Sequence, residues 1–465
     1  MTAVKVAESL GRMFYLVSPK ATTFATLDEV PMYVGEATPW LLIFALLELL
    51  YHAVKDRGVG LTRHTGSYSQ AKYRMNDTIA SLGLGAIQQM ARFIFGSLQM
   101  VTYNYIWDNY KIETVAFDEF KVSTWFGCFL ATEFAYYWIH RAAHEINILW
   151  AGHSVHHSSE IYNIAAGFRQ SLIQTYSFTF LFNLPLAFVF SPAQYLVHSQ
   201  FNLLFQVWLH TGRNRYCIDK NYGGTLIIWD RMFGTYASER LYPDVVATKE
   251  EEEPISYGLT HPVNTFDPIS IQFGHLVHIY KTVLITPGFA DKLKVVFYGP
   301  GWHPGVPRMG LLEEIPDIDV KNPPIKYDPK LPMLFNCHVA LQALIASAMG
   351  TSLLAGGYQV LPQWQTQALV VNTVVSFTTI GKIMDAKPNG LRLELVRTLA
   401  SFFIAEFVAR SGYWEQSYWQ RRGTLALADT FLLSSVFLGW CIYKYGNNWT
   451  SLTPAVVKKD KVKTH

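Results

Sequence analysis

Long apolar runs, separated by mixed or charged stretches, organise this chain of 465 residues. The first run covers Pro39 to Val54 and extends backward through Met32 to Ala37, so it approaches the ~20 residues that a membrane-spanning helix needs. The mixed residues 1–36 predict an interfacial N-terminal segment at the membrane surface. Two further runs, Ile79 to Trp107 and Ser123 to Ile139, are expected to cross the bilayer and return.

The same alternation continues through the rest of the chain. Leu172 to Ser191 and Pro192 to His210 predict an apolar hairpin whose two limbs start and end on one side. Residues 211–330 carry most of the soluble material and predict a cap of irregular structure. Residues 331–465 then predict a C-terminal four-helix transmembrane region with a basic tail, because they contain the apolar runs Leu331 to Ala355, Thr366 to Met384, Leu393 to Ala409 and Leu427 to Tyr445.

Composition changes what the length alone would suggest. A soluble chain this long would suggest two or three domains, but half of its residues are apolar, 16% are charged and 15% are aromatic. Such a chain has a large lipid-facing surface. We therefore expect an all-α integral membrane protein built as a multi-helix transmembrane bundle. The net charge of +3 and the lack of an aromatic and basic RNA motif argue against a nucleic-acid partner.

The charge bias between the apolar runs predicts an orientation. Loops rich in Lys and Arg stay in the cytosol, and the loop after the first run carries five basic residues against Asp56: Lys55, Arg57, Arg63, Lys72 and Arg74. From this start, the run that ends at Ile139 emerges into the cytosol. Four later crossings return the basic tail to the same side, although Arg421 and Arg422 then fall on the luminal side.

Five of the fifteen histidines lie between His140 and His157, in the sequence HRAAHEINILWAGHSVHH. Residues three or four apart share one face of a helix, so His140 and His144 face one way, and His153 shares a face with His156 and His157. A histidine-rich surface helix or hydrogen-bonded core imidazoles could also explain a cluster. The paired spacing favours metal binding, because neutral imidazole is the commonest side-chain metal ligand.

The metal chemistry stays open at this point. Two irons could bind and reduce O2 and attack an unactivated C–H bond if electrons are supplied, whereas two zincs would activate water for hydrolysis. A site at the end of a hydrophobic bundle favours a lipid substrate from the bilayer in either case.

HRAAH (140–144) and HSVHH (153–157) resemble the HxxxH and HxxHH boxes of the fatty acid hydroxylase superfamily of membrane di-iron oxygenases. Within it, three segments are similar to the alkylglycerol monooxygenase family: QFNLLFQVWLHT (200–211), GRNRYCIDKNYGGTLIIWDRMFGTY (212–236) and YGLTHPVNTFDPI (257–269). The resemblance implies that residues 37–330 form a fatty acid hydroxylase-like, membrane-embedded domain with a cytosolic His-rich di-iron cap.

The resemblance also implies an activity, a location and a ligand set. It implies an enzyme of the endoplasmic reticulum membrane that uses O2 and tetrahydrobiopterin to hydroxylate the ether-bearing carbon of an alkylglycerol, which gives a fatty aldehyde and a glycerol derivative. The implied iron ligands are His140, His144, His153, His156, His157 and His210. Glu145, directly after the first box, is a candidate catalytic carboxylate, and a solvent-facing helix Glu explains it equally well.

One departure from the family pattern is large. The family carries a third cluster of the type HHxxHH where Thr211 here runs straight into Gly212, and six imidazoles do not complete two iron coordination spheres. A splice form, a gene-model error or a true loss could account for this. Three functions stay open. The first is an ether-lipid monooxygenase, active or inactive in this form, and the second is a sterol or fatty acyl hydroxylase or desaturase that receives electrons from cytochrome b5. The third is a catalytically dead lipid-binding protein. His261, His275 and His278 are candidates to replace a lost ligand.

Overall fold

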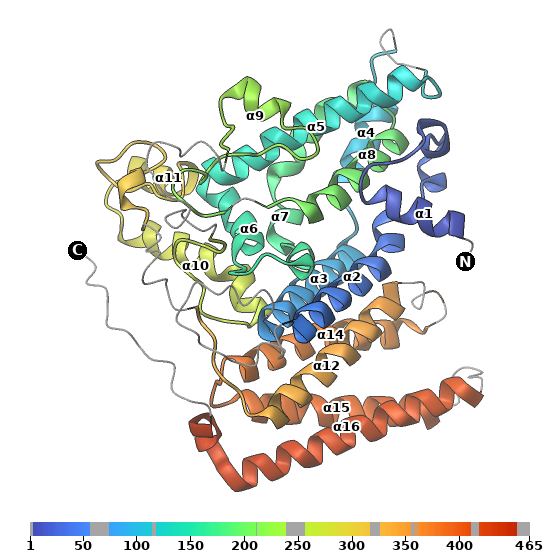
Figure 1. Ribbon diagram of the computed structural model, residues 1–465, viewed down its shortest axis with the longest axis vertical. Helices are drawn as coiled ribbons and strands as arrows, with labels where there is room; N and C mark the ends of the chain where they lie inside the picture. Colours follow the sequence, from blue (N-terminus) through green and yellow to red (C-terminus); the bar gives the residue numbers. More distant parts are fainter. Residues whose placement is uncertain are drawn as a thin grey trace.

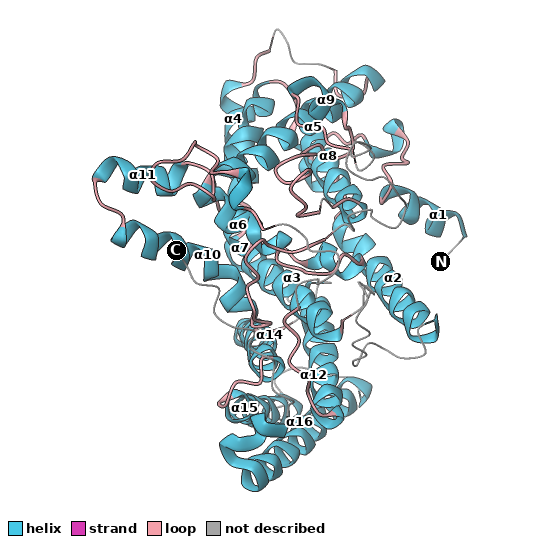
Figure 2. Ribbon diagram, turned by 60° about the vertical axis from the view of Figure 1, so that its left-hand side comes forward, coloured by secondary structure: helices cyan, strands magenta, loops and turns pink. Residues whose placement is uncertain are grey.

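The computed structural model describes residues 3–55, 74–113, 118–210, 212–238, 256–316, 326–354, 359, 361–410 and 418–452. Every regular element in these ranges is a helix (Figures 1 and 2). This confirms the all-α fold expected from the sequence. Residues 56–73, which make up most of the basic loop after the first apolar run, the position of Thr211 and the basic tail lie outside the described ranges.

Among the residues that the structure describes, four helical segments are long and apolar enough to cross a membrane by length and composition: Leu27–His52, Met333–Ser352, Gln363–Met384 and Arg421–Leu452. The first contains most of α2 (Tyr33–Lys55), and the others correspond to α12 (Met333–Ser352), α14 (Gln363–Met384) and α16 (Tyr418–Tyr445). Each overlaps an apolar run that the sequence predicted. The chain is therefore a membrane protein.

The C-terminal helices and α3 (Met75–Phe95) share one hydrophobic core. α15 (Gly390–Arg410) packs against α14 and α16, and α14 packs against α3. At this last contact a Cβ on Gly83 would lie 2.9 Å from the ring of Phe377, so only glycine permits the approach. The core residues extend from Ile79 on α3 to Leu438 on α16, which ties the C-terminal helices to the part of the chain that carries the histidines.

The expected crossing from Ile79 to Trp107 is wrong as a single segment. The chain forms α3 and then α4 (Leu98–Tyr110), because Gly96 takes a left-handed φ of 66° that ends α3. The Oγ of Ser97 accepts a hydrogen bond from the backbone N–H of Met100 and so caps α4. The first limb of the predicted hairpin also differs, since after α7 (Leu172–Thr175) it is the 3₁₀ helix η4 (Phe178–Phe188), followed by α8 (Pro192–Phe205).

The cap over residues 211–330 is more helical than we expected. It contains α9 (Ile228–Phe233), α10 (Pro268–Ile285) and α11 (Phe289–Phe297). α10 and α11 lie next to α6 at the same side of the molecule (Figures 1 and 2). The remaining elements are α1 (Ala3–Arg12), α5 (Val122–Glu145), α6 (Asn147–His157), η1 (Pro19–Thr22), η2 (Leu27–Glu29), η3 (Ile164–Phe168), η5 (Gln206–Trp208), η6 (Leu312–Glu314) and η8 (Gly446–Leu452).

Candidate metal centre

A one-residue break between α5 and α6 brings the two histidine boxes together. Ile146 ends α5 in an extended conformation with φ −126° and ψ 115°, and α6 begins at the next residue. The bend is held from α11: the backbone N–H of Asn147 donates to the carbonyl of Tyr298 at 2.8 Å, and its side-chain amide donates to the carbonyl of Val295 at 2.8 Å. The end of α5 and the face of α6 therefore approach each other.

The imidazoles of both helices converge on one point. The available nitrogens of His140, His144, His153 and His157 all lie within 4.8 Å of one another, and the Nε2 atoms of His153 and His157 are 3.0 Å apart. Nitrogens held at about 2.0–2.1 Å by one metal ion stand at about such separations. The ring of His210 lies 4.9 Å from that of His157.

His156 completes the group, since its ring centroid lies 5.0 Å from that of His210 and 5.8 Å from that of His153. The structure thus brings together all six imidazoles that the sequence and the resemblance suggested. Their role as ligands stays a prediction.

Two backbone carbonyls fix which nitrogen of the ring faces the centre. The Nδ1 of His140 lies 2.9 Å from the carbonyl oxygen of Tyr222, and the Nδ1 of His156 lies 3.3 Å from that of Arg169. A carbonyl can only accept, so in both rings Nδ1 carries the proton and Nε2 keeps its lone pair. In His140 this Nε2 is buried and has no hydrogen-bond partner among the described residues. A metal ion would satisfy it.

Two side chains orient another pair of imidazoles. The Nδ1 of His144 lies 3.0 Å from Asp219 Oδ1, and the Nδ1 of His153 lies 3.2 Å from Gln174 Oε1. Metal-binding histidines almost always donate the other ring N–H to such an acceptor, which fixes the tautomer and makes the ring a stronger ligand. Sequence reasoning did not identify either partner.

Burial keeps the cluster neutral. Desolvation, followed by the neighbouring imidazoles, lowers the pKa of His153 and His157 well below the usual value for histidine. Desolvation likewise lowers the pKa of His140, and it lowers that of His156 to about 4. Neutral imidazole is the form that binds metals, so the site is prepared for a cation at neutral pH.

The loop that supplies Tyr222 and Asp219 is anchored from two sides. Asp230 accepts the backbone N–H groups of Tyr222 and Gly223, each at 2.7 Å. Glu133 of α5 accepts the N–H of Thr225 at 2.7 Å and that of Leu226 at 3.0 Å. Glu133 thus holds the loop against the helix that carries His140.

The other candidates from the sequence lie outside the cluster. Glu145 pairs with Arg141 (Nε–Oε1 2.7 Å) and Arg308 (Nη1–Oε2 3.2 Å), and it is not among the residues that line the cavity described next. His275 Nε2 lies 2.7 Å from Asn147 Oδ1, with His278 beside it on α10. His261 hydrogen-bonds Thr260. None of these three histidines belongs to the converging group of described residues.

A cavity of about 630 Å³ opens against the imidazoles. Its lining includes five of the imidazoles, those of His140, His153, His156, His157 and His210, and also Gly96 to Met100, which join α3 to the first turn of α4. The lining contains apolar residues, such as Phe180, Leu196 and Leu203, together with the side-chain amides of Gln88, Gln174 and Asn202. A cavity with these dimensions and a few polar groups is typical of a small-molecule site.

Comparison with known proteins places this architecture in a class. Residues 125–219, which include all six imidazoles of the cluster, match the family model of fatty acid hydroxylase, a family of iron-dependent enzymes. A fatty acid hydroxylase domain is therefore present in the part of this membrane protein that carries the imidazole cluster. No solved structure matches the chain.

Individual relatives define the family more closely. Alkylglycerol monooxygenase from Homo sapiens is 38% identical over 428 residues, which cover 87% of this chain and 89% of the relative. Proteins of the same name from Danio rerio and Caenorhabditis elegans are 36% and 32% identical and cover 87% and 73% of this chain, and 89% and 70% of their own lengths. The chain belongs to the alkylglycerol monooxygenase family. The alignment with the Homo sapiens protein has 428 positions, which is more than the 87% of this 465-residue chain that it covers. It therefore includes positions at which the relative has a residue and this chain has none.

Proposed function

We propose that this protein is an ether-lipid monooxygenase whose imidazole cluster holds iron, and that tetrahydrobiopterin supplies the electrons. The observation that carries the proposal is the convergence of His140, His144, His153 and His157, with acceptors fixing the Nδ1 of His140 and His144. When bound, iron supplies O2 activation for attack on an unactivated C–H bond. Family membership supports the ether lipid as the substrate.

The chain's own residues would perform the binding and positioning. Apolar side chains such as Phe180 and Leu203 would hold the alkyl chain, while the amides of Gln88 and Asn202 offer hydrogen bonds to glycerol hydroxyls. This arrangement would place the ether-bearing carbon next to the imidazoles that line the cavity. Hydroxylation there gives a hemiacetal, which collapses to a fatty aldehyde and a glycerol derivative. The catalytic role predicted for Glu145 forms no part of this proposal, because its carboxylate pairs with Arg141 and Arg308 and does not line the cavity.

The donor set supports one metal ion better than two. Four imidazoles can surround a single ion, and His156 with His210 adds two more donors, but two irons need more ligands than six imidazoles provide. The missing third cluster at Thr211 and Gly212 would have supplied them. We therefore propose that this 465-residue form binds fewer than two irons and turns over little substrate. The same observation favours a second function, an inactive lipid-binding protein that keeps the cavity.

Location follows the charge bias. We propose that the protein lies in the endoplasmic reticulum membrane with the imidazole cluster at the cytosolic face, where a soluble pterin can reach it. The five basic residues from Lys55, at the end of α2, to Arg74, directly before α3, support this orientation.

Iron content tests the metal assignment without any assay of turnover. Purified protein should hold iron at fewer than two equivalents per chain, and His153→Ala should lower that content, because the variant loses one imidazole from the centre of the cluster. His278→Ala is the matched control, since His278 is exposed on α10 and outside the cluster. Equal iron content in His153→Ala and wild type would refute the site, and two tightly held irons would refute the proposed deficit.

A further inference from the structure

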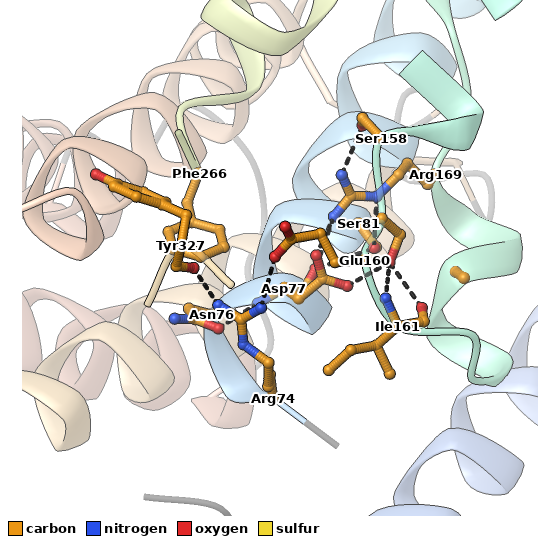
Figure 3. A network of polar contacts seen from close by, with 12 residues as sticks. Arg74, Asn76, Asp77, Ser81, Ser158, Glu160, Ile161, Arg169, Phe266 and Tyr327 are labelled. Carbon is orange, nitrogen blue, oxygen red and sulfur yellow. Dashed lines mark hydrogen bonds and ion pairs between the residues drawn. The ribbon is translucent and has the colours of Figure 1, made fainter. Parts of the chain in front are cut away.

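A buried ion pair, Asp77 with Arg169, joins α3 to the segments that follow the second histidine box (Figure 3). Arg169 is 1% exposed and Asp77 is 4% exposed, and Arg169 Nη2 lies 2.7 Å from Asp77 Oδ1. The guanidinium also donates to Ser81 Oγ at 3.1 Å and to Ser158 Oγ at 2.7 Å. One side chain therefore connects the first turns of α3 with the residue that follows the second histidine box.

The ion pair reaches the imidazoles through two short paths. The backbone carbonyl of Arg169 accepts the Nδ1–H of His156. On the other side, Ser158 directly follows His157 and accepts from the Arg169 guanidinium, while Ser159 Oγ donates to Asp77 Oδ2 at 2.5 Å. The ring of His156 and the two serines that follow His157 are thus tied to the same two charged residues.

A second ion pair continues the network along α3. Arg74 Nη1 lies 3.0 Å from Glu160 Oε2, and Lys326 Nζ donates to the Glu160 carbonyl at 2.9 Å. The segment from Ser158 to Glu160 is therefore fixed at three successive residues. In Figure 3 these side chains form one connected set between α3 and that segment.

Fold stability alone does not account for such a pair. Desolvating two charges costs about as much as their attraction returns, so well-packed apolar residues of similar volume often serve equally well. An ion pair does fix direction, because the planar guanidinium donates along set lines to partners that must be in place. The direction fixed here is that of the carbonyl and the serines that flank the His156–His157 pair.

We propose that Asp77 and Arg169 are positioning residues of the metal centre, which hold the Nε2 atoms of His156 and His157 toward the ion. This inference rests on the proposed metal-binding function of the cluster. Outer partners of metal-binding histidines typically contribute 10–100-fold to metal affinity. Neither residue would touch the metal or the substrate.

Cobalt binding tests the inference in the full-length protein. Co²⁺ is titrated into metal-free wild type and variants, and its visible absorption band reports both affinity and the number of ligands. We expect Asp77→Asn to weaken Co²⁺ binding by about 10–100-fold and to change the band intensity. Glu394→Gln is the matched control, because it breaks a Glu394–Arg397 pair of 2.6 Å that is equally buried in the C-terminal bundle. It should lower the melting temperature and leave Co²⁺ affinity unchanged.

A double variant separates positioning from folding. Asp77→Asn combined with Arg169→Gln leaves no unpaired buried charge, so its melting temperature should recover relative to Asp77→Asn. Its Co²⁺ affinity should stay low, because glutamine cannot span Ser81 and Ser158 together. Wild-type affinity in both Asp77 variants would overturn the positioning role while leaving the metal site intact. Failure of wild type itself to bind Co²⁺ would instead overturn the proposed metal function, and this inference with it.

Discussion

Gly152 offers a test of how tightly the centre depends on the packing of α6. A Cβ at this position would lie 2.9 Å from the backbone nitrogen of Gln174, 3.0 Å from its Cα and 3.1 Å from its Cβ. Gln174 is the residue whose Oε1 faces the Nδ1 of His153. Gly152→Ala therefore acts on the two partners of this hydrogen bond at once.

The size of the effect follows from these distances. Ordinary contact begins at 3.4 Å, so the helix and the Gln174 backbone must separate by about 0.5 Å, which equals the tolerance of about 0.5 Å for a functional site. The overpacking costs about 1–3 kcal/mol, whereas replacing a helical glycine by alanine returns about 1 kcal/mol. The net loss of stability should thus be at most about 2 kcal/mol, while Co²⁺ affinity should fall by about 10–100-fold.

Gly274→Ala is the matched control for this variant. Gly274 lies inside α10, and a Cβ there would meet no atom within 4 Å. It should raise stability by about 1 kcal/mol and leave Co²⁺ affinity unchanged. Melting temperature and Co²⁺ titration of both variants complete the test. If Gly152→Ala bound Co²⁺ as tightly as wild type, the argument that α6 and Gln174 jointly set the position of His153 would be refuted.

Three further outcomes are expected. Burial, aided by His278, lowers the pKa of His275 from 6.5 to about 4, so at pH values between these two the unfolded chain binds a proton that the folded chain does not. The free energy of unfolding should therefore decrease as the pH is lowered, by at most about 1.4 kcal/mol per pH unit. The melting temperature of His275→Gln should decrease less steeply than that of wild type over a series from about pH 7 to about pH 4, and equal slopes would refute this contribution. Leu203→Trp should fill part of the cavity and raise the Kd for the ether lipid about tenfold or more, as about 1–3 kcal/mol of overpacking implies, with unchanged iron content; an unchanged Kd would show that the lipid binds elsewhere. A glycosylation acceptor at 114–117, between α4 and α5, should be modified and one at 246–250 should not, and the reverse pattern would invert the proposed topology.

The sequence predicted what depends on local spacing. The four-residue separation of His140 and His144 and the His153 to His157 spacing determine which faces carry imidazoles, and these faces do converge. Apolar run length likewise located α2, α12, α14 and α16. These features follow from helix geometry and bilayer thickness, which any segment carries in its own residues.

Features that depend on tertiary contacts could not be predicted. The pairing of His144 with Asp219, 75 residues away, requires the anchored loop to return to α5, and nothing in the local pattern encodes that path. A signal was present in part, because the IDKNYGG sequence holds turn-forming residues, and Asp219 and Asn221 indeed adopt positive φ values of 52° and 58°. The break at Gly96 was hidden by the apolar residues on both sides, which made α3 and α4 look like one crossing.

Release of fatty aldehyde from an alkylglycerol, measured with O2 and tetrahydrobiopterin, tests the central claim most directly. The chain is compared with a form in which a third histidine cluster from a family member is inserted between Thr211 and Gly212. We expect pterin-dependent aldehyde from the extended form, none from its His153→Ala variant, and little or none from the 465-residue form. Full pterin-dependent turnover by the 465-residue form would contradict the proposed ligand deficit, and an extended form that needs cytochrome b5 instead of the pterin would contradict the assignment of the reductant.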